Sequence, residues 1–268
     1  MAIAIEFIRI IFVSTSTSRD TWYRDFFTGA ALDLWRQAKT EDETENECAF
    51  LQEIFEQSGS HLLDVPCGNG RLTIPMAEAG YKVTGLDFCQ EFLDDAAKRA
   101  ASINFEDGAV EFIQGDMRKI SSKTKFDGAF CFGNSFGYFN REGTEQMLQS
   151  VGECLKVGAK FVLESSMLAE TFLVNGAERE WVRVGDMLML IENHYDPRES
   201  CVQTEYTFIR DGKQESRHAT HWIYTSGEVC SMLSRAGLFV DDLFGSLEGD
   251  EYALGSERVV LVAEKRKG

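Results

Sequence analysis

The chain has 268 residues, of which 44% are hydrophobic and 26% are charged. This composition excludes a disordered or fibrous protein, and the length allows one sizeable α/β domain or two small ones. The formal net charge is −17, and an acidic surface repels both nucleic acid and anionic lipid. We therefore expect neither a nucleic acid nor a membrane as a partner.

The cysteines and the N-terminal residues indicate the compartment. Seven cysteines are scattered along the chain without a Cys-x-x-Cys pair, which disfavours a disulfide framework and a structural zinc site. We expect a cytoplasmic protein without a bound metal. Residues 1–19 are predicted to form a flexible leader, because the apolar stretch 1–13 is too short to span a bilayer and lacks a basic start. A signal peptide is the alternative interpretation of this stretch.

Residues 20–268 are expected to form one domain that begins with helices. Two helical patterns, at 20–37 and 43–57, predict a helical lid over residues 20–58. After the lid, short apolar runs alternate with helical patterns, and this alternation predicts a parallel, doubly wound sheet. The predicted strands are 61–65, 81–87, 110–115, 126–132 and 160–164, and the predicted helices are 71–79, 91–101 and 141–155.

Residues 166–224 break this alternation and predict an inserted antiparallel β segment. Residues 225–268 then close the domain with a helix, which begins with a capping box at Thr225, and two strands. The predicted fold class is therefore α/β: a Rossmann-like, seven-stranded, doubly wound sheet with an N-terminal helical lid and an inserted antiparallel β segment. The strands expected in these two parts are 181–195, 201–224 with a turn at Asp211 and Gly212, 238–244 and 258–263.

The strongest functional signal is a glycine loop after the first predicted strand. The segment LDVPCGNGR carries Asp64 near the end of that strand and brings Gly68 and Gly70 to a tight turn, where the backbone can approach a ligand closely. Asp87 ends the next strand, at the spacing of a carboxylate that accepts hydrogen bonds from ribose hydroxyls, and Asp116 follows the third strand. Because open α/β sheets bind ligands at the carboxyl ends of their strands, the three carboxylates are expected to face one crevice.

These motifs resemble those of the class I S-adenosylmethionine-dependent methyltransferases, and in particular of the small-molecule branch. The resemblance rests on the glycine loop, on Asp87, on the pair at 116–117 and on the segment FGNSFGY at 132–138. It is strong over residues 60–165, which would form the cofactor-binding half, and looser in the N-terminal helices and the closing part. It implies S-adenosyl-L-methionine as the cofactor and S-adenosyl-L-homocysteine as its product.

The resemblance also implies the contacts of the cofactor. One position departs from the family pattern, since its usual first loop glycine is Pro66 here, which has no N–H to donate. The implied partners are Gly68 and Gly70 for the methionine part, Asp64 for its ammonium, Asp87 for the ribose hydroxyls, Phe88 for adenine, and Asp116 with the Met117 backbone for the adenine amino group. Pro66, Cys67, Arg71, Phe132, Gly133 and Asn134 complete the implied cofactor site.

Other interpretations of these residues compete with this one. A nicotinamide dinucleotide site needs Gly-x-Gly-x-x-Gly, whereas Thr73 stands where the third glycine would be. Asp87 and Asp116 could be ordinary helix caps, and Phe88 could belong to the core.

The loop after the fourth strand bears on the methyl acceptor. It does not contain the Asn/Asp-Pro-Pro-Tyr motif that the resemblance associates with amino methylation of DNA bases and glutamine. The pair Pro66–Cys67 is similar to the nucleophile of cytosine C5 enzymes, but it lies in the cofactor loop, where a small packing group is the simpler interpretation. We therefore expect a small-molecule acceptor, enclosed by the N-terminal helices and the insertion.

Candidate acceptor contacts are aromatic residues and histidines. Tyr23, Phe27, Phe136 and Tyr138 would form aromatic walls, which suit a cationic or an apolar acceptor, although an aromatic stripe can equally be plain packing. Because residues 218 and 221 of a strand point to opposite faces, at most one of these histidines can enter a shared pocket. His221 is the candidate general base and His194 a candidate acceptor contact, while surface positions are the simpler alternative for both.

The sequence thus predicts methyl transfer by in-line displacement to a small-molecule amine or hydroxyl, such as an amino sugar, an amino acid or a natural product. The alternatives are a non-catalytic protein with this fold and an enzyme that methylates protein or RNA. We expect a monomer or a homodimer.

Overall fold

The computed structural model describes residues 19–122 and 124–267. Its larger sheet has seven strands in the order β10-β11-β5-β4-β1-β2-β3. The five strands from β3 to β5 are parallel, whereas β11 runs antiparallel to both of its neighbours. This topology confirms the predicted doubly wound sheet. Its strands are β1 (His61–Asp64), β2 (Lys82–Asp87), β3 (Val110–Gln114), β4 (Phe126–Cys131), β5 (Leu155–Ser165), β10 (Leu238–Phe244) and β11 (Val259–Lys265).

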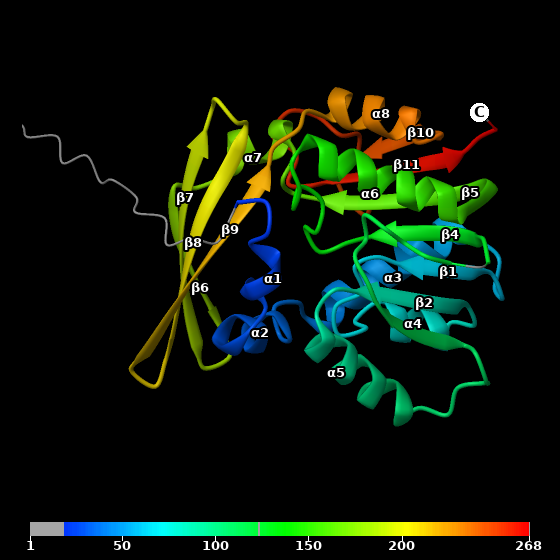
Figure 1. Cartoon of the computed structure of the whole chain (residues 1–268), viewed down its shortest axis with the longest axis horizontal. Helices are drawn as coiled ribbons and strands as arrows, with labels where there is room; N and C mark the ends of the chain where they lie inside the picture. Colours follow the sequence, from blue (N-terminus) through cyan, green and yellow to red (C-terminus); the bar gives the residue numbers. More distant parts are fainter. Residues whose placement is uncertain (1–18, 123, 268) are drawn as a thin grey trace, which may run out of the picture.

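Helices cover both faces of this sheet (Figure 1). One hydrophobic cluster joins the sheet to α3 and α4, and another joins its opposite face to α6 and α8. These clusters bury the alternate residues of strands that are apolar on both sides, as expected of a doubly wound sheet. The helices are α1 (Tyr23–Phe26), α2 (Gly29–Trp35), α3 (Glu41–Phe55), α4 (Thr73–Glu78), α5 (Gln90–Ala101), α6 (Arg141–Cys154), α7 (Ala169–Asn175) and α8 (Ser226–Arg235).

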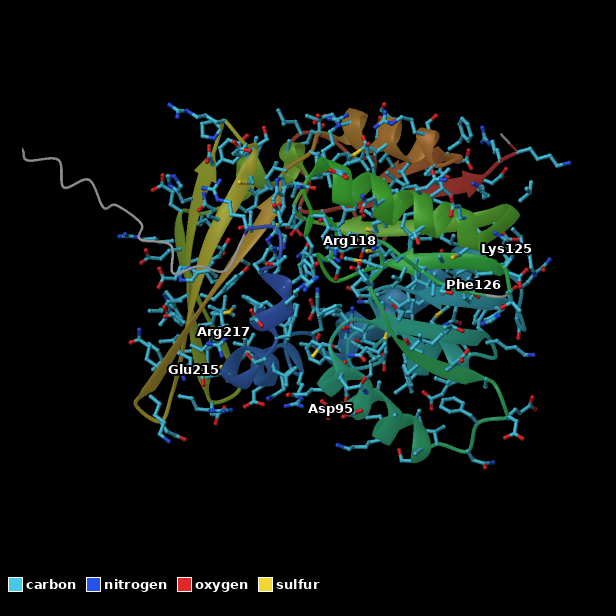
Figure 2. All side chains as sticks on the ribbon, viewed as in Figure 1. Asp95, Arg118, Lys125, Phe126, Glu215 and Arg217 are labelled. Carbon is cyan, nitrogen blue, oxygen red and sulfur yellow. The ribbon has the colours of Figure 1, made fainter. Side chains whose placement is uncertain are left out.

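The predicted insertion forms a second, antiparallel sheet of four strands in the order β6-β7-β8-β9. In Figure 1, α1 and α2 lie between this sheet and the seven-stranded one. Two contacts join α2 and the residue before it to β9: Glu215 accepts a hydrogen bond from the backbone N–H of Ala30, and Arg217 donates to Thr28 (Figure 2). The strands are β6 (Arg179–Val184), β7 (Met187–Asp196), β8 (Cys201–Arg210) and β9 (Lys213–Trp222).

The structure differs from the sequence-based expectations at two turns. The single helix expected over 20–37 is wrong: Thr28 is extended and Gly29 has a φ of 55°, so the chain breaks into α1 and α2 there. The single strand expected over 181–195 is also wrong, since Gly185, with a φ of 57°, starts a turn between β6 and β7. Both turns use the left-handed conformation that glycine adopts without steric cost.

The N-terminal leader and the location of the protein were also predicted from the sequence. The predicted leader lies outside the described residues, apart from Arg19. Within the described ranges, no helix has the length and apolar character needed to cross a bilayer. The cytoplasmic location stays a prediction.

The packing of α3 against the seven-stranded sheet provides a test of the fold. A Cβ at Gly128 of β4 would overlap the ring of Phe55, the last residue of α3. Because overpacking of a filled core costs about 1–3 kcal/mol, Gly128→Ala should lower the free energy of unfolding by that amount in chemical denaturation. The matched control is Gly227→Ala in α8, where an added Cβ meets no atom within 4 Å; this variant should be at least as stable as the wild type. Equal stability of the two variants would contradict the packing described here.

Candidate active site

A cavity of about 1170 Å³ runs from the carboxyl ends of β1 and β2 to the inner face of the four-stranded sheet. This volume exceeds the ~300–1,000 Å³ of a pocket for one small ligand. Most of the candidate residues meet here, although Gly70, Phe136 and His194 do not line the cavity. The candidates that line it are Tyr23, Phe27, Asp64, Pro66, Cys67, Gly68, Arg71, Asp87, Phe88, Asp116, Met117, Phe132, Gly133, Asn134, Tyr138 and His221.

Two buried carboxylates mark the strand ends. Asp64 is 2% exposed and accepts a hydrogen bond from the Thr73 hydroxyl at 2.6 Å. Asp87 is 8% exposed and accepts hydrogen bonds from the backbone N–H groups of Gly68 and Cys89, both at 2.8 Å. Burial penalises the charged form of each and raises the pKa of Asp64 to about 7 and that of Asp87 to about 6. Both side chains therefore change charge near neutral pH in the free protein.

Asp116 has a different environment. The Arg118 guanidinium approaches its carboxylate through Nε and Nη2, with a shortest distance of 2.6 Å, and also donates to the Tyr23 hydroxyl at 2.7 Å. Burial raises the pKa of Asp116, but the hydrogen bonds and charge of Arg118 outweigh it and hold the pKa below its ordinary value. Arg118 also lies over the ring of Phe139, 4.5 Å from its centroid. It thus ties the end of the third strand to α1.

The glycines of the two loops are needed for different structural reasons. At Gly68 and Gly133, both with positive φ, an added Cβ would meet no protein atom within 4 Å, so the backbone is bare where it lines the cavity. At Gly70 an added Cβ would lie 3.1–3.3 Å from Ala96, Phe112 and Ile74. Gly70 is therefore required by packing beneath the loop, while Gly68 and Gly133 leave room for a ligand close to the backbone.

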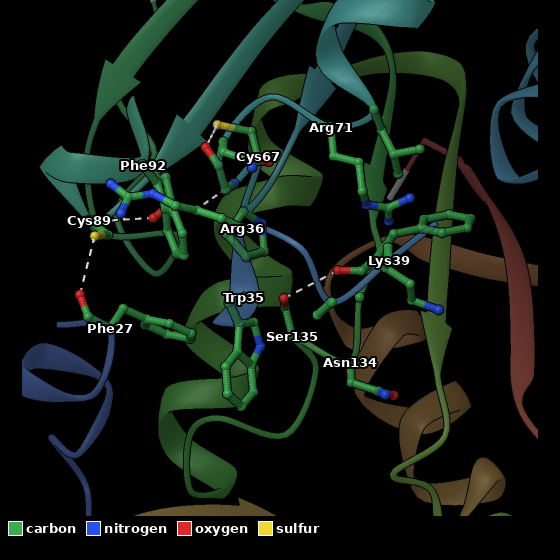
Figure 3. Close-up of a pocket in the computed structure, with 18 of the residues that line it drawn as sticks. Phe27, Trp35, Arg36, Lys39, Cys67, Arg71, Cys89, Phe92, Asn134 and Ser135 are labelled. Carbon is green, nitrogen blue, oxygen red and sulfur yellow. Dashed lines mark hydrogen bonds between the residues drawn. The ribbon is translucent and has the colours of Figure 1, made fainter. Parts of the chain in front are cut away.

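Cys67 is a packing group rather than a nucleophile. Its Sγ lies 2.8 Å from the position that a Cβ on Gly85 would take, so it fills the space that this glycine leaves. Burial raises the pKa of its thiol, which keeps the sulfur protonated. In Figure 3 a second thiol, that of Cys89, donates to the backbone oxygen of Phe27 at 3.8 Å, which links the start of α5 to the segment between α1 and α2.

Helix α3 is anchored to the glycine loop by an ion pair between its buried Glu47 and the half-buried Arg71. Arg71 donates to the carboxylate of Glu47 at 2.6 Å and to the Thr44 hydroxyl at 3.1 Å. Glu47 is 1% exposed. On the far side of the loop, the buried Glu164 of β5 accepts the backbone N–H of Gly133 at 3.0 Å. These contacts fix both glycine-containing walls of the cavity, at 68 and at 133.

The opposite end of the cavity is aromatic. The ring of Trp22 lies 4.8 Å from that of Tyr138 and 5.5 Å from the imidazole of His221, between ring centroids. Phe27 packs against both Trp22 and Tyr138. Burial lowers the pKa of His221 to about 4, so this imidazole is neutral at physiological pH. His218, on the other face of β9, does not line the cavity.

Sequence reasoning did not assign several residues of this site. Trp22 and Tyr206 line the aromatic end, and Arg118 orders Asp116. The spacing of Arg118, two residues after Asp116, was an available signal for an ion pair. By contrast, Phe136 is buried against Tyr224, which explains its absence from the cavity lining.

Comparisons with known proteins agree on one family. Residues 62–158 match the family described as "Methyltransferase domain". The cypemycin N-terminal methyltransferase of Streptomyces sp is 25% identical over 212 residues, which cover 78% of this chain and 84% of that protein. The CcbJ methyltransferase of Streptomyces caelestis has a TM-score of 0.77 at 17% identity, covering 92% of this chain and 98% of that chain. The S-adenosylmethionine-bound amino pentose methyltransferase CalS10 of Micromonospora echinaspora has a TM-score of 0.67 at 18% identity. The match covers 89% of this chain and 97% of that chain.

The fold places acidic strand ends and a glycine loop at one cavity, as the family resemblance requires. Residues 62–158 thus match the methyltransferase domain family, and the comparisons together indicate an S-adenosylmethionine-dependent methyltransferase.

The raised pKa of Asp64 gives a stability prediction. A carboxyl with a folded pKa of about 7 and an unfolded one of ~3.9 binds its proton more tightly in the folded state, so stability is lost as the pH rises from ~3.9 to about 7 and the loss is complete above that. Asp64→Asn keeps an acceptor for Thr73 and removes this ionisation. It should raise the Tm of the ligand-free protein at pH 8, and the gain should shrink towards pH 5. The control is Asp107→Asn, which removes an exposed carboxylate; an equal gain from this variant at pH 8 would refute the assignment to burial.

Proposed function

We propose that this enzyme transfers the methyl group of S-adenosylmethionine to a small-molecule amine or hydroxyl. The single observation that carries the proposal is the continuity of the cavity, which joins the acidic strand ends to an aromatic wall formed by α1, Tyr138 and the four-stranded sheet. Its volume supports simultaneous binding of a cofactor and a second small molecule. The antiparallel sheet closes one side of the aromatic end, which supports an enclosed acceptor rather than a long polymer.

The residues at the strand ends fit the cofactor. The bare backbone at Gly68 and Gly133 leaves the space that a ligand needs at both loops. Asp87 would bind the ribose hydroxyls, because its carboxylate lies at the end of β2 and lines the cavity. Asp64 would hold the ammonium of the methionine part, and Phe88, which is 40% exposed beside the cavity, would contact adenine.

Asp116 would bind the adenine amino group beside the backbone of Met117. Its carboxylate already faces Arg118, which keeps it ionised and therefore able to accept only. An ionised acceptor suits an amino group, which donates.

The printed names of similar proteins support a small-molecule or peptide-terminal acceptor. The chain is similar to an amino pentose methyltransferase, a sugar N-methyltransferase and a cypemycin N-terminal methyltransferase. When bound, the cofactor would supply an electrophilic methyl group on a sulfonium. The protein would contribute position, because a displacement requires the acceptor atom in line with the methyl–sulfur bond and holding two reactants in this geometry supplies a large part of the rate. The aromatic wall would also exclude water from the reacting atoms.

Asp87 tests the cofactor end. Asp87→Ala removes a carboxylate that would pair with ribose hydroxyls, and an unpaired site costs about 1–3 kcal/mol. Calorimetric titration with S-adenosylhomocysteine should therefore give a Kd weaker by about 5- to 150-fold. The control is Asp94→Ala, which removes an exposed acid from α5 and should leave the Kd unchanged. An unchanged Kd in a folded Asp87→Ala variant would remove Asp87 from the cofactor site.

The acceptor end is tested by turnover. Methyl transfer from labelled S-adenosylmethionine should be detected with at least one member of a panel of amines and hydroxylated metabolites. Cofactor binding without transfer to any member would favour a non-catalytic protein. Transfer to tRNA or to a protein substrate in preference to the panel would contradict the small-molecule assignment.

A further inference from the structure

Two buried polar groups at the aromatic end of the cavity have no hydrogen-bond partner within residues 19–122 and 124–267. They are Nε1 of Trp22 and Nδ1 of His221. The two side chains belong to residues that line the cavity and are 4% and 7% exposed. A buried donor or acceptor without a partner loses its hydrogen bonds to water and gains none in the protein, which destabilises the fold. Two such groups in neighbouring rings, on the wall of one cavity, indicate a place where a ligand completes the hydrogen bonding.

The surroundings of this pair are aromatic, with rings packed edge to face. The ring of Tyr138 lies 4.8 Å from Trp22 and 5.3 Å from His221, between centroids, so the three rings form one cluster. Tyr206 of β8 and Phe26 of α1 extend the aromatic wall, with ring centroids 5.4 Å apart. Because aromatic rings pack well against the edges and faces of other rings, this wall favours a ligand with a flat aromatic body that carries one or two polar atoms.

The distribution of charge separates the two ends of the cavity. All of its acidic lining residues within the described part of the chain come from helices α3 to α5, from the last residues of β1 and β2, or from the segment that follows β3. The segment 22–39 and the four-stranded sheet add no carboxylate to the lining within the described residues. A protonated amine at the aromatic end would therefore be desolvated without a carboxylate beside it, and only the faces of the aromatic rings would offset that cost.

The imidazole of His221 also discriminates between acceptors. It cannot take a proton from an alkylammonium, because burial lowers the pKa of His221 to about 4, whereas an ordinary side-chain ammonium has a pKa of ~10. A hydroxyl differs, since its proton becomes strongly acidic as the oxygen gains the methyl group. A weakly basic imidazole can accept that proton during the transfer.

We propose that the acceptor is an uncharged hydroxyl compound with a flat apolar body, held against Tyr138 by hydrogen bonds to Trp22 and His221. This inference rests on the methyl transfer proposed above. The reacting hydroxyl donates to the imidazole of His221, and Nε1–H of Trp22 donates to an oxygen of the acceptor. In the transfer, the methyl–sulfur bond breaks and its electron pair stays on sulfur. The bond from oxygen to methyl forms, and the hydroxyl proton passes to His221.

The binding test uses two probes of similar size, catechol and benzylamine, the second of which is an ammonium at pH 7.5. Each is titrated calorimetrically into the enzyme saturated with S-adenosylhomocysteine. Catechol should bind at least about tenfold more tightly than benzylamine. Trp22→Phe and His221→Phe keep an aromatic ring and remove one hydrogen-bonding group each, so each should weaken catechol binding by about tenfold. Equal or tighter binding of benzylamine, or binding of neither probe, would overturn the proposal.

Turnover separates the two residues. With catechol as acceptor, His221→Gln should lower kcat by roughly 10²-fold, while Trp22→Phe should act mainly by raising KM. The matched control is His218→Gln, on the same strand but outside the cavity, which should change neither value. Unchanged kcat in His221→Gln would exclude the proton transfer.

These outcomes also separate this inference from the function on which it rests. Methyl transfer to amines alone would contradict the hydroxyl class and leave the small-molecule methyltransferase intact. Failure of the wild type to bind S-adenosylhomocysteine, or to methylate any small molecule, would contradict the proposed function itself.

Discussion

The burial of two carboxylates at the ends of neighbouring parallel strands is the constraint on which the site depends. Asp64 and Asp87 are almost fully removed from water, and the hydrogen bonds that replace hydration come from Thr73, Gly68 and Cys89. Backbone N–H groups can reach Asp87 only if the loop turns tightly above it, and a positive φ at Gly68 permits that turn. The conformation of the loop therefore determines which hydrogen bonds Asp87 receives, and so affects its ionisation.

Helix α1 and the residue before it also connect two parts of the site. Trp22 and Tyr23 are adjacent in sequence, yet Trp22 faces His221 and Tyr138, while Tyr23 bonds to Arg118 and contacts Phe88. Since α1 is only four residues long, the two ends of the cavity are ordered by a single turn of helix. Packing of aromatic edges against faces stabilises this short element, whose own backbone hydrogen bonds are too few to do so.

Much of this architecture was predictable from the sequence, because alternating strand and helix patterns and the order Asp64, Asp87, Asp116 are local signals. The breaks at Gly29 and Gly185 were missed, since one glycine inside an apolar pattern does not reveal its φ. The environment of Asp116 was missed for another reason: the contact between Arg118 and Tyr23 joins residues 95 positions apart. For His194 the strand was predicted, but its remoteness from the cavity follows from the position of the whole sheet.

The four-stranded sheet is built from consecutive hairpins, so each strand pairs with its neighbour in sequence and none inserts into the seven-stranded sheet. Its internal register is therefore independent of the strands that carry the acidic residues. This independence makes the sheet a separable module: substitutions at strand residues such as Met189, Tyr206 and Ala219 would reshape the aromatic end of the cavity without changing the register of the strands that carry Asp64 and Asp87. Substitutions in α1 have no such freedom, because they alter both ends together.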